Sequence, residues 1–418
     1  MRNCDLVPGS VSHCQICGSI DLQHVVDLGF SAPCDSLLTR DQLKQPETTF
    51  PLNSWRCRAC GLVQIDYVVD PRQLFHPTYP YRSGITDTLK QNLHGTAVRV
   101  AGKLGTAAGS LVVDIGSNDG TVLEGFQRVG MRVVGVEPTN IAQIAIANGI
   151  PTINNFFSHS IAGAIRQEHG PAAIVTAANV FAHVNQLSQL LEGVHDLLAD
   201  DGVFVSESHY MVDILETLQY DSIYHEHLKF YLIKPLQRLF ADHGFTLEDA
   251  ERIPNYGGSI RAYARKGTNG AVSNSVKELL AMEEKLGCYD DATYVRFRGR
   301  AEESRRNLRS LIVKLNDEGK RVVGIGCPGR AVTLLAYSGL TPDLLPYIAE
   351  QSTSLKLGLY TPGTHIPVVD ESILFNEQPA YALMLTWHYA APIISALRKR
   401  GLKSKIIVPL PEIVIHEP

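Results

Sequence analysis

The chain has 418 residues, 44% of them hydrophobic and 19% charged, which is typical of a globular protein with two or three domains. A formal net charge of −5 at pH 7 and the lack of any Lys/Arg run argue against nucleic acid as a main partner. No apolar stretch reaches the roughly 18 residues of a membrane span, and the first ten residues contain no apolar signal core. We therefore expect a cytoplasmic protein that works as a monomer and contacts no membrane.

Residues 1–78 predict a small zinc-binding module. Cys14 and Cys17 form one C-x-x-C pair, Cys57 and Cys60 form a second, and a glycine follows each pair. Two such pairs supply the four thiolates of a tetrahedral zinc ion, and this closed shell leaves no coordination position for a substrate. A redox role would need a C-x-x-C pair in a thioredoxin-like helical setting, which the sequence lacks. We therefore predict a structural zinc ion in a reducing compartment.

A loop punctuated by proline and glycine, 76–84, follows the module and carries Tyr79, Tyr81, Arg82 and Ser83. One interpretation is a linker that only packs its aromatic side chains. The other is a loop that reaches over the mouth of the next domain and supplies hydroxyl donors.

Residues 79–265 predict a doubly wound α/β domain, because strand and helix patterns alternate along them. The run 111–115 is typical of a buried strand, and Asp114-x-Gly116-x-x-x-Gly120 follows as a tight turn into a helix. The next strand ends at Glu137, where such folds bind the hydroxyls of a ribose. The turn lacks the G-x-G-x-x-G pattern of diphosphate binding, so S-adenosylmethionine fits better than a dinucleotide. The alternative is an ordinary strand–turn–helix with a stray acid.

Further strands are expected at 150–153, 173–178 and 202–207, helices at 140–148 and 186–198, and a closing hairpin at 246–264. Ligands of such sheets bind at the carboxyl ends of the strands. The residues predicted to bind the cofactor are Asp114, Gly116, Ser117, Asn118, Asp119, Gly120, Glu137, Pro138 and Asn179.

The segment Tyr224-His225-Glu226-His227 lies between the last parallel strand and the hairpin. Two histidines and a carboxylate are costly to bury without a purpose. A metal site at His225 and His227 would lack a third ligand nearby, and a solvated surface segment is a second alternative. We favour an acid–base centre beside the methyl donor, because histidine is near half-protonated at neutral pH and a neighbouring carboxylate tunes it.

Residues 266–418 predict a helical connector and then a second Rossmann-like domain. A strand at 321–325 leads into Gly324-x-Gly326-x-x-Gly329, with Glu350 further along and additional strands at 381–386 and 405–408. This pattern suits NAD or the diphosphate of another ligand, such as a nucleotide sugar, and the spacing does not separate the two.

With these motifs in order, the chain resembles the three-domain sugar C-methyltransferases that act on nucleotide-linked deoxysugars. The similar motifs cover nearly the full length: the zinc module, the loop 79–84, VVDIGSNDGT, GVEPT, ANVFAHV, YHEH, GGSIR and YTPGTHIPV at 360–368. The resemblance implies an α/β fold with a zinc-binding module, a central class I methyltransferase domain and a C-terminal Rossmann-like domain. It also implies methylation of a 4-keto sugar nucleotide beside the ketone, commonly at C3, with the substrate between the middle and C-terminal domains.

The resemblance further implies roles for individual side chains. His227 is the expected catalytic base, and Tyr224, Glu226, His183 and Tyr79 match other active-site positions. The residues expected to bind the substrate are Tyr81, Arg82, Ser83, Tyr256, Arg330, Tyr360 and His365.

Three positions depart from the family's usual pattern and bear on the nucleotide and the sugar more than on the reaction. Tyr256 stands where a histidine is common, 326–331 reads GCPGRA where GAPAKG is common, and Glu350 stands where an aspartate is common. Two other functions fit parts of the sequence. An NAD-dependent sugar-nucleotide dehydrogenase would leave the turn at Asp114 unexplained, and a non-catalytic sugar-nucleotide scaffold would not need His227.

Overall fold

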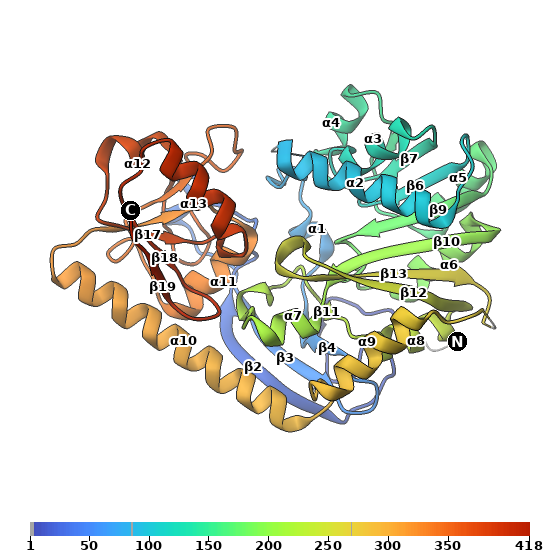
Figure 1. Ribbon diagram of the computed structural model, residues 1–418, viewed down its shortest axis with the longest axis horizontal. Helices are drawn as coiled ribbons and strands as arrows, with labels where there is room; N and C mark the ends of the chain where they lie inside the picture. Colours follow the sequence, from blue (N-terminus) through green and yellow to red (C-terminus); the bar gives the residue numbers. More distant parts are fainter. Residues whose placement is uncertain (1–3, 85–86, 269) are drawn as a thin grey trace.

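Three β-sheets organise the protein in the computed structural model, which describes residues 4–84, 87–268 and 270–418. The first three residues of the N-terminal stretch considered above lie outside this description. In Figure 1 the C-terminal sheet and the seven-stranded sheet lie on opposite sides of the molecule, and the strands of the N-terminal sheet run below and between them. The long helix α10 (Asp291–Asp317) runs along the lower edge toward the C-terminal sheet.

The N-terminal sheet borrows one strand from the middle of the chain. Its order is β11-β4-β3-β2, and β11 pairs antiparallel with β4. The segment directly after His227 therefore belongs to the N-terminal sheet. Bounds are β2 (Leu22–Ser31), β3 (Phe50–Cys57), β4 (Val63–Ile65) and β11 (Lys229–Phe230), and β1 (Gly9–Ser10) and β5 (Tyr67–Val68) form a separate pair. The same part of the chain contains η1 (Gln42–Lys44) and α1 (Pro71–Leu74).

The central sheet has seven strands in the order β12-β13-β10-β9-β6-β7-β8. Strands β10, β9, β6, β7 and β8 pair in parallel, and β12–β13 is an antiparallel hairpin on one edge. Every residue of β6 is buried, as its continuous apolar run predicts. Bounds are β6 (Leu111–Ile115), β7 (Arg132–Val136), β8 (Thr152–Ile153), β9 (Ala172–Ala178), β10 (Leu198–His209), β12 (Phe245–Ile253) and β13 (Ser259–Lys266).

Helices cover this sheet and connect its strands. They are α2 (Asp87–Leu104), α3 (Thr121–Arg128), α4 (Ala142–Ala147), α5 (His159–His169), α6 (Leu187–Leu197), α7 (Met211–Glu216), α8 (Ile233–Asp242) and α9 (Asn274–Lys285), with the short turns η2 (Tyr220–Ser222) and η3 (Asn255–Gly257). Strand β10 continues to His209, past the predicted end at Glu207. The predicted doubly wound domain with a closing hairpin is confirmed.

The C-terminal sheet has six strands in the order β16-β15-β14-β17-β18-β19, all parallel except β19. The alternation of strand and helix confirms a second Rossmann-like unit. Bounds are β14 (Val322–Ile325), α11 (Gly329–Ser338), β15 (Ile348–Glu350), β16 (Val368–Asp370), α12 (Ser372–Glu377), β17 (Tyr381–Met384), η4 (Trp387–Tyr389), α13 (Ala390–Lys399), β18 (Lys405–Val408) and β19 (Val414–His416). No helix in the described residues combines the length and apolar character that a membrane crossing requires.

Candidate active site

The turn after β6 has the shape that its glycines predict. Gly116 has a φ of 67°, and a Cβ there would collide with Val180. Gly120, with a φ of 79°, starts α3. Both conformations favour glycine because a side chain strains the left-handed region. The backbone of this turn is thus free to approach a ligand closely.

Glu137 lies directly after β7 and holds the turn in place. Its carboxylate accepts hydrogen bonds from the backbone N–H of Asn118 and of Thr139, each at 2.9 Å. The side chain is buried, and each carboxylate oxygen retains a further acceptor direction. Burial, helped by Glu137, raises the pKa of the neighbouring Asp114 to about 7, while the Thr176 hydroxyl donates to its Oδ1 at 2.6 Å.

A cavity of about 500 Å³ opens at the carboxyl ends of β6, β7 and β9. Most of the predicted cofactor residues line it, together with several residues predicted for catalysis or substrate binding. They are Asp114, Gly116, Ser117, Asn118, Glu137, Pro138, Asn179, Tyr79, Tyr81, Ser83, His183 and Tyr256.

The polar groups of this cavity fit S-adenosylmethionine. Ser117 Oγ and Asn179 Oδ1 are buried and have no hydrogen-bond partner among the described residues. Buried polar atoms of this kind usually have a partner, so a polar ligand is the natural one. The Glu137 carboxylate at the same wall suits the two ribose hydroxyls of an adenosine.

The loop 76–84 closes over the turn and does more than link two domains. Backbone N–H groups of Ser83 and Gly84 donate to Asn118 Oδ1 at 2.8 Å and to Asp119 Oδ2 at 2.9 Å. Arg82 Nε lies 3.4 Å from Asp119 Oδ2. Asp119, Gly120 and Arg82 are therefore not among the residues that line the cavity, and the Asp119–Arg82 pair fastens the loop to the turn.

His227 lies next to the cavity, in contact with a residue that lines it. Its ring centre is 5.0 Å from that of His183 and 4.0 Å from that of Tyr224. His227 Nδ1 is 2.7 Å from the carbonyl oxygen of Ser222. Because a carbonyl only accepts, Nδ1 carries the hydrogen and Nε2 keeps a lone pair. Burial, with a smaller contribution from the charge on Arg330, lowers the pKa of His227 to about 3.

Glu226 lies in a buried polar cluster that the sequence did not predict. The Tyr79 hydroxyl donates to its Oε2 at 3.0 Å, and the Cys34 thiol donates to its Oε1 at 3.3 Å. Burial and the nearby Asp35 raise the pKa of this carboxyl group. Asp35 is itself paired with Lys356 at 2.7 Å, so a lysine of the chain already provides a positive charge beside Cys34, Asp35 and Glu226.

His225 points away from the other histidines of the site. Its Nε2 donates to the carbonyl oxygen of Pro51 at 3.1 Å, and its ring packs edge-on against Phe50 of β3. Burial lowers the pKa of His225 to about 4. Its contacts attach the segment to the N-terminal sheet.

The hairpin β12–β13 brings Tyr256 to the cavity. Tyr256 has a left-handed φ of 55°, its hydroxyl is 3.4 Å from that of Tyr81, and its backbone N–H donates to the Tyr389 hydroxyl at 3.1 Å. Glu207 fixes this turn, because its carboxylate accepts from Asn255 and pairs with a buried arginine of β13.

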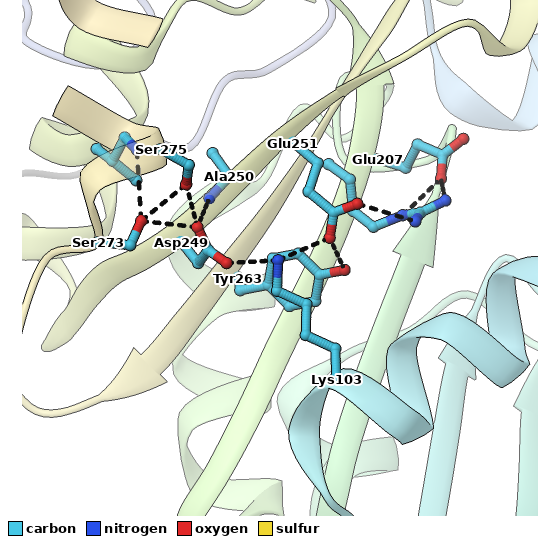
Figure 2. A network of polar contacts seen from close by, with 10 residues as sticks. Lys103, Glu207, Asp249, Ala250, Glu251, Tyr263, Ser273 and Ser275 are labelled. Carbon is cyan, nitrogen blue, oxygen red and sulfur yellow. Dashed lines mark hydrogen bonds and ion pairs between the residues drawn. The ribbon is translucent and has the colours of Figure 1, made fainter. Parts of the chain in front are cut away.

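A second polar network holds the same hairpin from the side of α2. Figure 2 shows Lys103 reaching toward Asp249 and Glu251, and the distance to the Glu251 carboxylate is 2.9 Å. Tyr263 also donates to Glu251, at 2.6 Å. The hairpin that carries Tyr256 is thus attached to α2.

The predicted substrate residues of the C-terminal unit lie outside this cavity. Arg330 donates to Gln219 Oε1 at 3.1 Å and to Ser222 Oγ, and its guanidinium stacks over Trp387. Tyr360 pairs through its backbone with Leu38, and His365 contacts Glu47. The backbone N–H of Cys327 in the glycine turn donates to Glu350 at 2.6 Å. The substrate roles of Arg330, Tyr360 and His365 stay predictions.

The four predicted zinc ligands come together in the N-terminal unit. Their ligand atoms lie within 4.8 Å of one another and all four residues are buried. Sulfur–sulfur distances are 3.5 Å for Cys14–Cys60 and for Cys17–Cys57. A tetrahedral ion with Zn–S bonds of about 2.3 Å separates its ligands by a similar distance. The donor set and its geometry fit a structural zinc ion.

Comparisons with known proteins match the whole arrangement. A family model described as zinc binding domain matches residues 14–75, a methyltransferase domain model matches 90–250, and a C-methyltransferase C-terminal domain model matches 254–411. The chain is 34% identical over 406 residues to the C-methyltransferase NovU of Streptomyces niveus, covering 96% of each chain. The chain belongs to the C-methyltransferase family.

Among solved structures, the CurJ carbon methyltransferase is 14% identical with a TM-score of 0.35 and covers 48% of this chain and 61% of that one. The magnesium protoporphyrin IX methyltransferase of Synechocystis PCC 6803 with bound SAM is 14% identical with a TM-score of 0.32, covering 43% and 79%. Family membership confirms a SAM-dependent C-methyltransferase that contains zinc, as predicted from the sequence.

Proposed function

We propose that this C-methyltransferase methylates a nucleotide-linked 4-keto-deoxysugar at the carbon next to the ketone, with C3 as the expected position. One observation carries the proposal. His227 is a buried, neutral imidazole whose Nδ1–H is held by Ser222, and its Nε2 lone pair has no partner among the described residues. A placed neutral base is what the removal of a proton beside a ketone requires.

The aromatic side chains in contact with His227 support its assignment as the base. His183 lines the cofactor cavity and contacts His227 on one side, and Tyr224 contacts it on another. When bound in the cavity, S-adenosylmethionine supplies an electrophilic methyl group. His227 takes the α-proton at Nε2, and the electrons of the C–H bond move toward the ketone oxygen. General-base catalysis of this kind contributes roughly 10²–10⁴-fold.

Hydroxyl and imidazole donors near His227 stabilise the negative oxygen that forms. Tyr79, Tyr224 and His183 are candidates, and each well-placed donor contributes about 3 kcal/mol. Burial and the nearby Glu226 hold the pKa of Tyr79 well above 10, so its hydroxyl stays protonated and able to donate. In this structure the single hydrogen of that hydroxyl is donated to Glu226, so Tyr79 can donate to the enolate oxygen only once this bond is exchanged.

Turnover with a substrate panel tests the reaction. Purified protein is incubated with S-adenosylmethionine and with dTDP-, GDP- and CDP-linked 4-keto-6-deoxyhexoses, and NMR locates any new C-methyl group. We expect one nucleotide series to be methylated beside the ketone. Methylation of an oxygen atom would contradict the proposal. So would methylation of another ketone by a protein that methylates none of these sugars.

Solvent exchange tests the base separately from methyl transfer. With S-adenosylhomocysteine in place of the methyl donor, the wild type should exchange the substrate's α-hydrogen for deuterium. His227→Asn should bind both ligands yet lose most exchange and most kcat, because asparagine accepts no proton near neutral pH. His225→Asn is the matched control, since His225 faces β3. Exchange that survives in His227→Asn and disappears in His225→Asn would reverse the two roles.

A further inference from the structure

A third imidazole adjoins His227, and no sequence motif pointed to it. His209 is the last residue of β10, where it pairs with Ser259 of the hairpin. Its ring centre lies 4.5 Å from that of His227, with the planes tilted by 49°. The carboxyl end of β10 is next to the end of β9, which leads to the cavity residues Asn179 and His183. His209 is therefore at the ligand-binding edge of the sheet.

The hydrogen bonding of His209 differs from that of the other buried histidines. In the described residues His225 bonds to Pro51, His227 to Ser222 and His243 to Leu239. His209 is only 9% exposed, yet no described residue forms a hydrogen bond with either of its ring nitrogens. The ring nitrogens of His209 are not among the fully buried polar atoms that lack a partner, so they keep access to the space beside the ring. A ligand in that space can accept from the His209 N–H.

Two further buried nitrogens near His209 lack a hydrogen-bond partner among the described residues. Arg330 Nη1 and His388 Nδ1 are buried and have no hydrogen-bond partner within the described chain. Both residues belong to the C-terminal unit and act electrostatically on His209. The surroundings of His209 thus suit a ligand rich in oxygen, and His183, which also contacts the base, lines the cofactor cavity.

The charge of His209 suits a donor better than a base. Burial holds its pKa well below 6.5, and His227, Arg330, His183 and His388 all add to the shift. The imidazole is therefore neutral and carries one N–H. Ser222 fixes the tautomer of His227 and keeps its Nε2 lone pair free, whereas no protein group in the described residues fixes that of His209. His227 suits proton removal, and His209 suits donation.

We propose that His209 is a further catalytic residue, which donates its N–H to the ketone oxygen of the substrate as the enolate forms. The inference rests on the function proposed above. With bonds of about 1.5 Å (C–C) and 1.2 Å (C=O), the ketone oxygen lies only about 2.4 Å from the α-carbon. A group that stabilises this oxygen must therefore adjoin the base, as His209 does. In this step the C–H bond breaks, its proton forms an N–H bond at His227 Nε2, and the negative charge on oxygen accepts from His209.

The test compares variants that remove or keep the donor. His209→Leu should lower kcat and the rate of solvent deuterium exchange by about 10²–10³-fold, as the loss of one oxyanion donor does elsewhere. Its KM for the sugar nucleotide and its affinity for S-adenosylhomocysteine should change little. His209→Asn keeps an N–H donor and should recover at least about tenfold of the loss. His209→Phe, which keeps a planar ring, replaces the leucine variant if that protein does not fold.

His243→Asn is the control, because His243 is equally buried but bonded to Leu239 and Ser188. It should leave the exchange rate unchanged. Exchange by His209→Leu and His209→Phe within about threefold of wild type would overturn the role of His209, as would a change confined to KM. If His227→Asn still abolishes exchange in that case, the proposed function stands and only this inference fails. Undiminished exchange in His227→Asn would instead overturn the proposed function.

Discussion

Replacing Glu137, directly after β7, should weaken cofactor binding more than any single change in the turn after β6. Its two carboxylate oxygens already accept backbone N–H groups from Asn118 and Thr139 at 2.9 Å, which places the remaining acceptor directions toward the cavity. A hydrogen bond to a charged group contributes about 1.5–3 kcal/mol. Glu137→Ala removes two such acceptors from the ribose and also releases Asn118, so we expect a loss of at least about 2 kcal/mol, or roughly 30-fold in affinity.

Calorimetric titration with S-adenosylhomocysteine measures this loss directly. Glu124→Ala is the control, because Glu124 lies on the adjoining helix α3 and contacts Arg128 and His94 outside the cavity. Thermal unfolding without ligand shows whether the variant is folded. A change in affinity of less than about threefold in a folded Glu137→Ala protein would place the ribose elsewhere and refute the reasoning.

Three further predictions concern the base, the metal and acid stability. Arg330→Gln should raise the pKa of the acid limb of kcat/KM, because the charge that disfavours protonated His227 is lost; an unchanged limb would contradict this. Metal analysis should find one zinc per chain, and removal of the zinc by a chelator should abolish turnover. Gln15 lies between the zinc ligands Cys14 and Cys17 and donates to the carbonyl oxygen of Leu228, the residue after His227. The pKa of His225 is about 4 in the folded protein, below its unfolded value of 6.5. The unfolded state therefore binds more protons, and the free energy of unfolding falls by about 1.4 kcal/mol per pH unit as the pH decreases below 6.5. Denaturant titrations at pH 7, 6 and 5 should therefore show a shallower decline for His225→Asn than for wild type.

The cofactor turn could be predicted from the sequence because its determinants are local. A strand end or a tight turn explains the role of each of Gly116, Gly120 and Glu137. Hydrophobic runs mark the strands that flank the turn. The C-x-x-C pairs are equally local, since each pair brings two thiolates to one ion. Short sequence patterns were therefore enough to predict the S-adenosylmethionine site and the zinc site.

The surroundings of Glu226 could not be predicted in this way. Cys34 and Glu226 are 192 residues apart, and Asp35 and Lys356 are 321 residues apart. Nothing in their local sequence marks them as partners. His209 was missed for a different reason, because β10 was expected to end at Glu207 and the strand continues. The contact of His209 with His227 depends on how the strand end and the segment 220–227 pack together.

The position of the proposed base depends on all three sheets. Arg330 of the C-terminal unit bonds to Ser222, whose carbonyl holds His227. From the N-terminal unit, Cys34 bonds to the neighbouring Glu226, and β4 pairs with the strand that follows. The central sheet contributes the cavity. A catalytic segment held at three places keeps its geometry only when all three units are folded, so loss of the zinc or of the C-terminal unit should lower turnover.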